Sequence, residues 1–307
     1  MSKLYHRYRA YGVNIGSEFE VRELPISSFA GEPDVVISFL SGGYHGFEAS
    51  DQGALWKTAE GLFELYLSGV ARFVVRGGRE ILVDPEPEAT LDEICVYLLG
   101  SVFGALLQQR ELLVLHAGAI YWKGAAILFA GKSGVGKSTL VSTLQLRGYP
   151  MISDDLTAIA WTENGAALAT PSYARARLCA DVAERLHWPL INSDRTWPTD
   201  TKFRVDIARY HPEPVPVGFV LVLRVGEQRE VHLERLEGSE KVKSLLLATY
   251  RRKFLKGLGL KAFQFARTTR FASSVPVYRL TRPCFIDGIE PTADRVESLL
   301  SGGLPGI

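Results

Sequence analysis

The chain has 307 residues, of which 47% are hydrophobic and 22% are charged, and this composition excludes a disordered, collagen-like or disulfide-scaffold protein. Lys and Arg number 35 against 34 Asp and Glu, so the net charge of +1 argues against a dedicated nucleic-acid binder. The cysteines Cys95, Cys179 and Cys284 lie far apart and lack metal-ligand spacing, as expected in a reducing compartment. We therefore expect a globular, cytoplasmic protein.

The hydropathy of the chain indicates neither a signal peptide nor a membrane-spanning helix. The first residues lack the apolar segment of a signal peptide. The longest weakly charged stretches cover 94–107 and 112–130; the first is too short to span a bilayer, and His116 and Lys123 interrupt the second. We expect no transmembrane helix and no membrane partner.

The first part of the chain predicts a small β-rich domain, because short apolar runs alternate with turn residues up to the proline-rich stretch 84–88. Thr90-Leu91-Asp92-Glu93 is then a capping signal before the apolar run 94–107, which predicts a buried helix. We place a smaller β-rich domain at 1–88, with substrate recognition as its expected role, and a larger domain at 89–307. The strands predicted in the smaller domain cover 13–15, 34–40, 71–75 and 80–83.

The second part changes to an α/β pattern. Residues 125–130 form an uninterrupted apolar strand, followed by a glycine-rich turn and a helix over 137–147 that Gly148 closes. This order of elements predicts an α/β nucleotide-binding domain. Further predicted elements are a strand at 151–153, a hairpin of 157–161 and 166–170 around a two-residue Asn164-Gly165 turn, strands at 203–207, 217–225 and 231–236, a basic helical region over 239–270 and a last helix at 292–300.

The turn between that strand and that helix matches the phosphate-loop pattern G-x-x-x-x-G-K-[ST]. Its backbone N–H groups can wrap phosphates, Lys137 can reach the β- and γ-phosphates, and the Ser138 hydroxyl can ligate Mg²⁺. The alternative is a glycine-rich turn without a ligand. The pattern thus predicts ATP and Mg²⁺ as cofactors, and the residues predicted to bind them are Gly131, Ser133, Gly134, Val135, Gly136, Lys137, Ser138 and Thr139.

Two adjacent carboxylates, Asp154 and Asp155, follow the next predicted strand and should lie near the same phosphate site. One can hold Mg²⁺, while the other can accept the proton of an attacking hydroxyl. The simpler interpretation is that one of them is a turn or cap residue. His116 lies in the apolar segment 113–119, where a histidine is more often a core residue than a catalytic one.

Taken together, His116, the loop 131–138, Arg147-Gly148-Tyr149 and Ser153-Asp154-Asp155 resemble the catalytic core of the HPr kinase/phosphorylase superfamily. The resemblance implies a C-terminal P-loop kinase domain, akin to phosphoenolpyruvate carboxykinase in fold, that transfers the γ-phosphate of ATP to a serine hydroxyl. It further implies that His116, Lys137 and Asp155 are catalytic, with Asp155 as the general base, and that Ser138 and Asp154 hold Mg²⁺.

The N-terminal part resembles a particular subgroup of that superfamily. Residues 11–18 and 22–25 are similar to HPr-kinase-related proteins of bacterial peptide gene clusters, including lasso-peptide kinases that phosphorylate the C-terminal serine of a precursor. A peptide or protein with an acceptor serine is therefore the expected partner. The bifunctional enzymes carry a Mg²⁺-binding glutamate in a downstream motif, whereas residues 171–178 here contain no acid, so we do not expect efficient phosphorolysis.

The sequence leaves three alternatives open. The acceptor of a kinase can also be HPr itself or a small hydroxylated metabolite such as free serine. A nucleotide-dependent switch or hydrolase would turn over ATP without any acceptor. A degenerate nucleotide-binding module would only present peptides through its β-rich part, although the intact Lys137 and Asp155 argue against it.

Basic residues provide the last candidates. Arg175, Arg177, Lys202 and Arg204 can neutralise a transferring phosphate, with a solvated surface as the alternative. The segment 241–282 is rich in Lys and Arg and contains no acid. This segment can dock an acidic peptide or a neighbouring subunit of a homo-oligomer. Nucleic acid is a third possible partner, although the balanced charge of the chain argues against it. The alternative is a solvated helix face without a partner.

Overall fold

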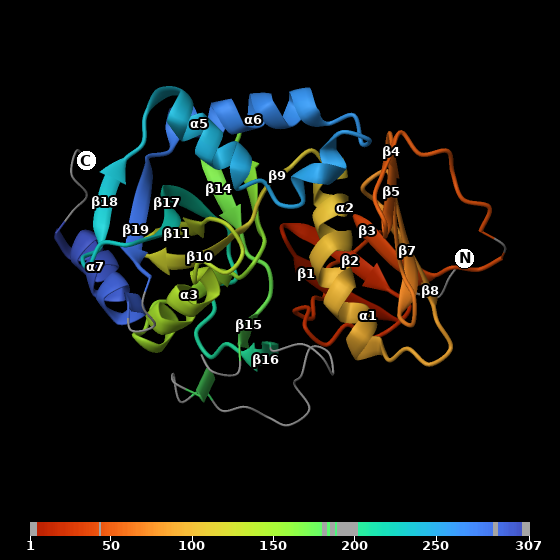
Figure 1. The fold of residues 1–307 in the computed structure, drawn as a ribbon. Helices are drawn as coiled ribbons and strands as arrows, with labels where there is room; N and C mark the ends of the chain where they lie inside the picture. Colours follow the sequence, from red (N-terminus) through yellow and green to blue (C-terminus); the bar gives the residue numbers. More distant parts are fainter. Residues whose placement is uncertain are drawn as a thin grey trace. The chain divides into compact units, whose positions relative to one another are not determined.

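The computed structural model describes residues 5–42, 44–179, 183–184, 188, 202–284 and 288–302. The chain forms two compact units: the first comprises Met1–Val114 and Thr249–Arg267, and the second comprises Leu115–Ala248 and Thr268–Ile307. Each unit holds a large β-sheet with helices (Figure 1), so the predicted mixed α/β class is confirmed. The division differs from the predicted boundary after residue 88, because the following helix and the returning segment 249–267 belong to the first unit.

The sheet of the first unit has the strand order β1-β2-β3-β8-β7-β6-β5-β4. The predicted strands are present as β2, β3, β7 and β8, and the pattern failed to indicate the others. Their alternating residues put Phe63, Phe73 and Ile81 in a core that solvent does not reach. The strands are β1 (His6–Ala10), β2 (Val13–Ser17), β3 (Val35–Phe39), β4 (Asp51–Gln52), β5 (Trp56–Ala59), β6 (Leu62–Leu67), β7 (Ala71–Arg76) and β8 (Glu80–Pro85).

The predicted buried helix is longer than its apolar run. α1 (Leu91–Tyr97), the π-helical turn η1 (Leu98–Val102) and α2 (Phe103–Gln109) follow one another without a break. Thr90 caps the start as predicted, since its hydroxyl accepts from the Glu93 N–H and its own N–H donates to the Glu93 carboxylate. The resulting helix of 19 residues, Leu91–Gln109, is long and apolar enough to cross a membrane. This corrects the expectation that the apolar run 94–107 is too short to do so. Inside the protein, 72% of the most apolar window of this helix is buried. A core helix has these properties too.

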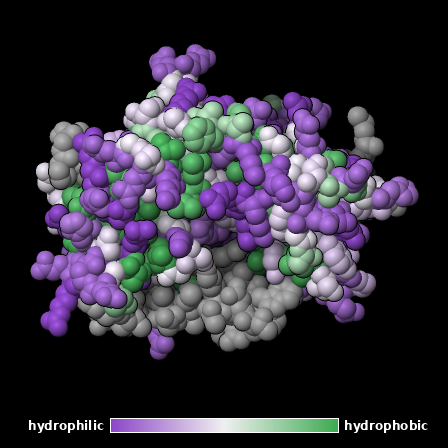
Figure 2. All heavy atoms as spheres, turned by 45° about the horizontal axis from the view of Figure 1, so that its top comes forward, coloured by the Kyte–Doolittle hydropathy of each residue, from purple (hydrophilic) through white to green (hydrophobic). Residues whose placement is uncertain are grey.

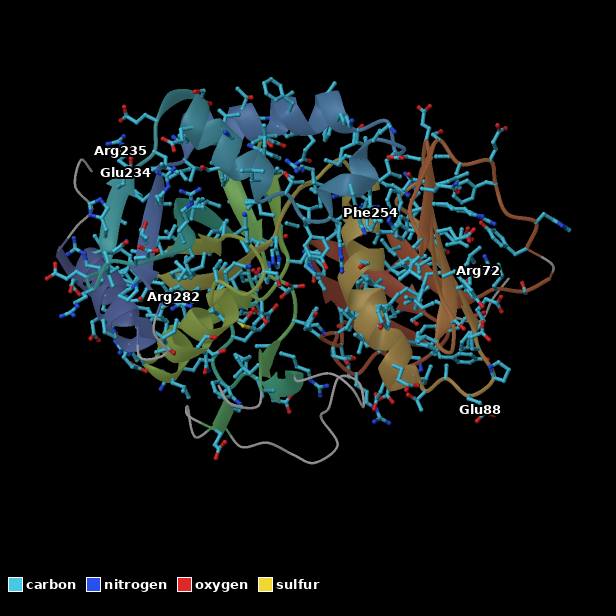
Figure 3. The ribbon with its side chains drawn as sticks, in the orientation of Figure 1. Arg72, Glu88, Glu234, Arg235, Phe254 and Arg282 are labelled. Carbon is cyan, nitrogen blue, oxygen red and sulfur yellow. The ribbon has the colours of Figure 1, made fainter. Side chains whose placement is uncertain are left out.

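The segment Thr249–Arg267 returns to the first unit and packs against its sheet. It contains the short helix η2 (Arg252–Leu255), whose Phe254 is buried against the rings of Trp56 and Phe63, with ring centroids 5.2 and 4.7 Å apart. A Cβ on Gly257 would lie 2.0 Å from Oγ1 of Thr58, so this close approach requires glycine. Figure 3 labels Phe254 at this position.

In the second unit the central strands run parallel. β11 (Ala125–Ala130) pairs in parallel with β17 (Val215–Gly226), and β17 pairs in parallel with β19 (Val277–Pro283). Their C-terminal ends therefore lie at one edge of the sheet. α3 (Lys137–Leu146) packs on β10 (Ala117–Trp122) and β11, and α7 (Ile289–Gly302) packs on α3. Leu140 and Leu144 of α3 and Val296 and Leu300 of α7 share one core with the buried face of the sheet.

The predicted elements of this unit are present with differences in bounds. The apolar segment 113–119 is divided between two strands, β9 and β10, and β15 and β19 are additional. The hairpin of β13 and β14 closes differently: the Thr162 N–H donates to the Ala166 carbonyl, which leaves three loop residues instead of two, with Gly165 at φ +86°. The elements are β9 (Leu113–Leu115), which leads into the unit, β10 (Ala117–Trp122), β11 (Ala125–Ala130), α3 (Lys137–Leu146), β12 (Met151–Ser153), β13 (Thr157–Trp161), β14 (Ala167–Thr170), β15 (Arg175–Cys179), β16 (Lys202–Asp206), β17 (Val215–Gly226), β18 (His232–Arg235), α5 (Gly238–Leu247), α6 (Lys261–Ser274), β19 (Val277–Pro283) and α7 (Ile289–Gly302).

The surface is mainly hydrophilic on the face that Figure 2 shows, with hydrophobic areas between the charged side chains. Large apolar side chains are nevertheless exposed at single positions, among them Leu146 and Leu247. Isolated exposed apolar residues are normal on a folded protein.

Candidate functional site

The predicted phosphate loop connects β11 to α3, at the edge where the parallel strands end. Three of its glycines have left-handed backbones, with φ of +147° at Gly131, +83° at Gly134 and +94° at Gly136. A Cβ on Gly131 would lie 2.9 Å from the Leu223 carbonyl, so this glycine is required for space as well as for conformation. Residues 132–134 are exposed, which leaves the loop open to a ligand.

Lys137 begins α3 and is only 6% exposed. Its Nζ donates hydrogen bonds to the carbonyl oxygens of Gly131 and Lys132, both at 2.9 Å, and lies 2.9 Å from Nε2 of His116. The ammonium is therefore held over the loop itself. Phosphate oxygens bound by the loop would compete with these carbonyls for the same cation.

His116 connects Lys137 to Asp155. Its Nδ1 lies 2.9 Å from the backbone oxygen of Asp155 and 3.2 Å from the carboxylate Oδ1 of the same residue. Both of these atoms are acceptors, so the hydrogen-bond network assigns the proton to Nδ1 and leaves Nε2 to accept from Lys137. The structure thus brings together the three residues that the sequence singled out for catalysis.

Asp155 occupies an unusual backbone conformation. The Leu156 N–H donates to the Asp154 carbonyl at 2.7 Å, and Asp155 between them has φ +62°, which makes a γ-turn of the rare left-handed kind. Such a conformation costs on the order of 1–3 kcal/mol in a residue other than glycine. On either side of the turn, Ser153 and Thr157 form a buried hydroxyl pair 2.6 Å apart, which holds its two ends.

The two carboxylates lie in different environments. The Asp155 side chain is 41% exposed, whereas Asp154 is buried at 7%. A Cβ on Gly118 would lie 3.7 Å from Oδ1 of Asp154 and 2.9 Å from Val141, so the glycine keeps the space beside this carboxylate free of a side chain. One carboxylate is therefore accessible from solvent and the other faces the interior.

The donor set fits Mg²⁺. Asp154 supplies a carboxylate and Ser138 a hydroxyl, and Mg²⁺ in nucleotide sites is usually held by one or two carboxylates together with phosphates and water. In the part of the chain that the structure describes, no three His, Cys, Asp or Glu side chains gather as a complete metal cage. Ser138 and Asp154 remain the residues that we predict to hold the ion.

Arg282, which the sequence placed only among the basic residues of 241–282, lies beside the phosphate loop. It lies near the end of β19, where its Nε donates to the Val135 carbonyl and its Nη1 to the Pro283 carbonyl, both at 2.9 Å. A Cβ on Gly136 would lie 3.2 Å from its guanidinium. This side chain thus adds a second cation beside the phosphate loop. No local pattern indicates it, because the contact joins distant parts of the chain.

The Arg147-Gly148-Tyr149 segment has a structural role in this fold. The Arg147 guanidinium pairs with three carboxylates of α7, those of Glu290, Asp294 and Glu297. Gly148, at φ +103°, ends α3. The segment therefore ties α3 to α7 and lies away from the loop residues that would contact phosphate.

The other basic candidates are dispersed. Arg175 pairs with Asp206 at 2.7 Å across the β15–β16 ladder, while the side chains of Arg177, Lys202 and Arg204 lie outside the described residues. The segment 241–282 is not one basic surface, because it is divided between the two units and several of its cations have partners. Those partners are Asp51 for Lys256, the ring of Trp161 for Arg270, Glu234 and Glu240 for Arg279, and the phosphate loop for Arg282.

Comparison with known proteins shows similarity to solved structures and no match to a family model or a curated protein. Among solved structures, the chain is similar to the Hpr(Ser) kinase/phosphatase from Coxiella burnetii, with 15% sequence identity and a TM-score of 0.32. The matched region covers 62% of the present chain and 99% of the Coxiella chain.

Proposed function

We propose that the second unit is an ATP-dependent kinase that transfers the γ-phosphate to a serine hydroxyl of a peptide or protein. The observation that carries this proposal is the contact chain from Lys137 through His116 to Asp155. It couples a phosphate-loop lysine to an accessible carboxylate through the two nitrogens of one imidazole ring. A simple phosphate-binding turn needs no such carboxylate.

In the proposed reaction the acceptor oxygen forms a bond to the γ-phosphorus while the bond from that phosphorus to the β–γ bridging oxygen breaks. Asp155 accepts the hydroxyl proton, and ADP leaves. Lys137, the loop N–H groups and Arg282 stabilise the negative charge on the phosphates. Ser138 and Asp154 would hold Mg²⁺, which neutralises phosphate charge when bound.

The exposure of Asp155 favours a macromolecular acceptor over hydrolysis by a sequestered water. Its carboxylate is open to solvent, and the neutral His116 ring orients it from one side. The resemblance noted from the sequence makes a precursor peptide with a C-terminal serine the first acceptor to test. HPr and free serine are the other two candidate acceptors.

The decisive experiment measures transfer of labelled γ-phosphate from ATP to three acceptors: a peptide ending in serine, HPr and free serine. The same peptide ending in alanine, which lacks the acceptor hydroxyl, is the control. We expect Lys137→Ala to abolish transfer to the acceptor that the wild type uses. Lys123→Ala is the matched control, because this exposed lysine lies in the turn before β11, at the opposite end of that strand from the phosphate loop. ATP turnover that is equally fast without any acceptor would contradict the kinase and support a hydrolase.

A further inference from the structure

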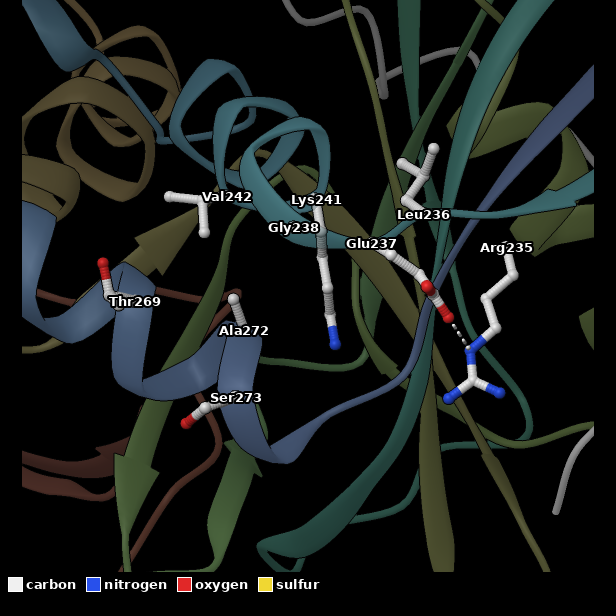
Figure 4. A pocket seen from close by; sticks show the side chains of 9 residues that line it. All are labelled: Arg235, Leu236, Glu237, Gly238, Lys241, Val242, Thr269, Ala272 and Ser273. Carbon is white, nitrogen blue, oxygen red and sulfur yellow. Dashed lines mark ion pairs between the residues drawn. The ribbon is translucent and has the colours of Figure 1, made fainter.

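The second unit contains a pocket of about 380 Å³ that the proposed reaction does not use. It lies between α5, α6 and the segment that follows β18 (Figure 4). Lys241 of α5 points into it, Val242 and Ala272 provide apolar wall, and Arg235 and Glu237 line one side. The pocket therefore combines cationic and apolar surface, which is typical of sites for small organic ligands.

This pocket is separate from the phosphate loop. Arg235 pairs with Tyr278 near the start of β19, whereas Arg282 contacts the loop near the end of that strand. Tyr278 and Arg282 are four positions apart along the strand, or about 13 Å at about 3.3 Å per residue. In Figure 3, Arg235 and Arg282 accordingly lie toward opposite ends of the sheet. A ligand in the pocket would not occupy the nucleotide site.

The charge in the pocket is incompletely neutralised. Among the described residues, the ammonium of Lys241 has no ion-pair or hydrogen-bond partner. The neighbouring carboxylates of Glu234 and Glu240 do not line the pocket, and they share the single positive charge of Arg279. Glu237, the carboxylate that lines the pocket, lies 3.5 Å from Arg235. Burial, followed by the positive charge of Arg235, lowers the pKa of Lys241, and Glu237 opposes this shift.

We propose that this pocket binds a small organic acid, whose carboxylate contacts Lys241 and Arg235 and whose apolar part packs on Val242 and Ala272. Among the residues that line the pocket, two cations and Glu237 leave one net positive charge, which a single carboxylate neutralises. A phosphate monoester carries about −1.5 to −2 charges at pH 7, which exceeds the net positive charge of the pocket lining. The apolar wall favours an acid with a hydrocarbon body over a free inorganic anion.

Benzoate tests the proposal, with neutral benzamide as the ligand of matched shape. The wild-type protein is acetylated with limiting acetic anhydride, and mass spectrometry compares Lys241 with Lys243, an exposed lysine of the same helix that does not line the pocket. At benzoate concentrations about ten times its dissociation constant, we expect acetylation of Lys241 to slow about tenfold. Lys243 should be unaffected, and benzamide should protect neither lysine. Equal protection by both compounds, or none by benzoate, would overturn the proposal.

Calorimetric titration with benzoate provides the second readout. We expect Lys241→Met to weaken binding at least about tenfold through loss of a charge-assisted contact, and Lys243→Met to leave it unchanged. Benzoate binding should persist in Lys137→Ala, which separates this pocket from the phosphate loop. Loss of binding in Lys137→Ala together with retention in Lys241→Met would place the acid at the nucleotide site. If Lys241→Met fails to fold, the protection experiment on the wild type decides alone.

Discussion

The ammonium of Lys137 lies 2.9 Å from Nε2 of His116, and this contact assigns the imidazole as a neutral ring with its proton on Nδ1. A doubly protonated ring has no acceptor to offer an ammonium. When phosphate oxygens replace the loop carbonyls around Lys137, the same ring continues to hold Asp155 through Nδ1. The histidine thus links phosphate binding to the orientation of the proposed base.

The division of labour between the two aspartates is the first prediction. Asp155→Asn keeps the shape but removes the proton acceptor, so kcat should fall by roughly 10²- to 10⁴-fold with little change in ATP affinity. Asp154→Asn should instead raise the Mg²⁺ concentration needed for half-maximal transfer. Steady-state kinetics at several Mg²⁺ concentrations measure both effects. Normal transfer by Asp155→Asn would show that this carboxylate is not the base.

The left-handed backbone of Asp155 predicts that stability and activity conflict at this position. Glycine adopts φ +62° without strain, so Asp155→Gly should raise the free energy of unfolding by about 1 kcal/mol while abolishing transfer. Glu111→Gly is the matched control, because Glu111 has φ +60° in the other unit, and it should give a similar gain with activity retained. Urea denaturation measures the stability. A loss of stability in Asp155→Gly alone would mean that the carboxylate contacts outweigh the strain.

Arg282 should act on nucleotide binding. Removing its guanidinium releases the Val135 carbonyl and one cation beside the loop, so Arg282→Met should raise KM for ATP about tenfold or more. The effect on KM for the acceptor should be small. Arg229→Met, at an exposed position after β17, is the control. If both variants bind ATP like the wild type, Arg282 only caps the end of β19.

The local part of the site was predictable from the sequence. An apolar run, a glycine-rich turn and a helix are adjacent in the chain, so the pattern places β11, the loop and α3 almost to the residue. Asp154 and Asp155 were found for the same reason, because they directly follow β12. Their γ-turn was not foreseen, since an aspartate outside glycine-rich turns rarely adopts a positive φ.

What the sequence missed depends on contacts between distant residues. Arg282 reaches Val135 only because β19 lies parallel to β17. The sequence around either residue contains no pattern that indicates this contact. The return of segment 249–267 to the first unit was missed likewise, because the burial of Phe254 against Phe63 leaves no periodic pattern. Tertiary packing, rather than propensity, decides both features.

The last prediction concerns three consecutive cations, Arg251, Arg252 and Lys253, at the start of η2 in the first unit. All three are exposed, and none forms an ion pair among the described residues. Lys253 lies over the Trp56 ring at 5.4 Å, and its pKa is lowered by burial and by Arg251. Such a cluster of like charges favours an acidic partner, and we expect it to dock the acceptor rather than ATP.

Replacing these three residues with Ala should therefore raise KM for an acidic acceptor and leave ATP affinity nearly unchanged. The difference from the wild type should shrink as salt rises from about 0.1 M to about 1 M, because the Debye length falls from about 10 Å to about 3 Å. Lys256→Ala is the matched control, since this lysine is already paired with Asp51. A selective loss of ATP binding would assign the cluster to the nucleotide, and unchanged kinetics for both substrates would identify it as a solvated surface.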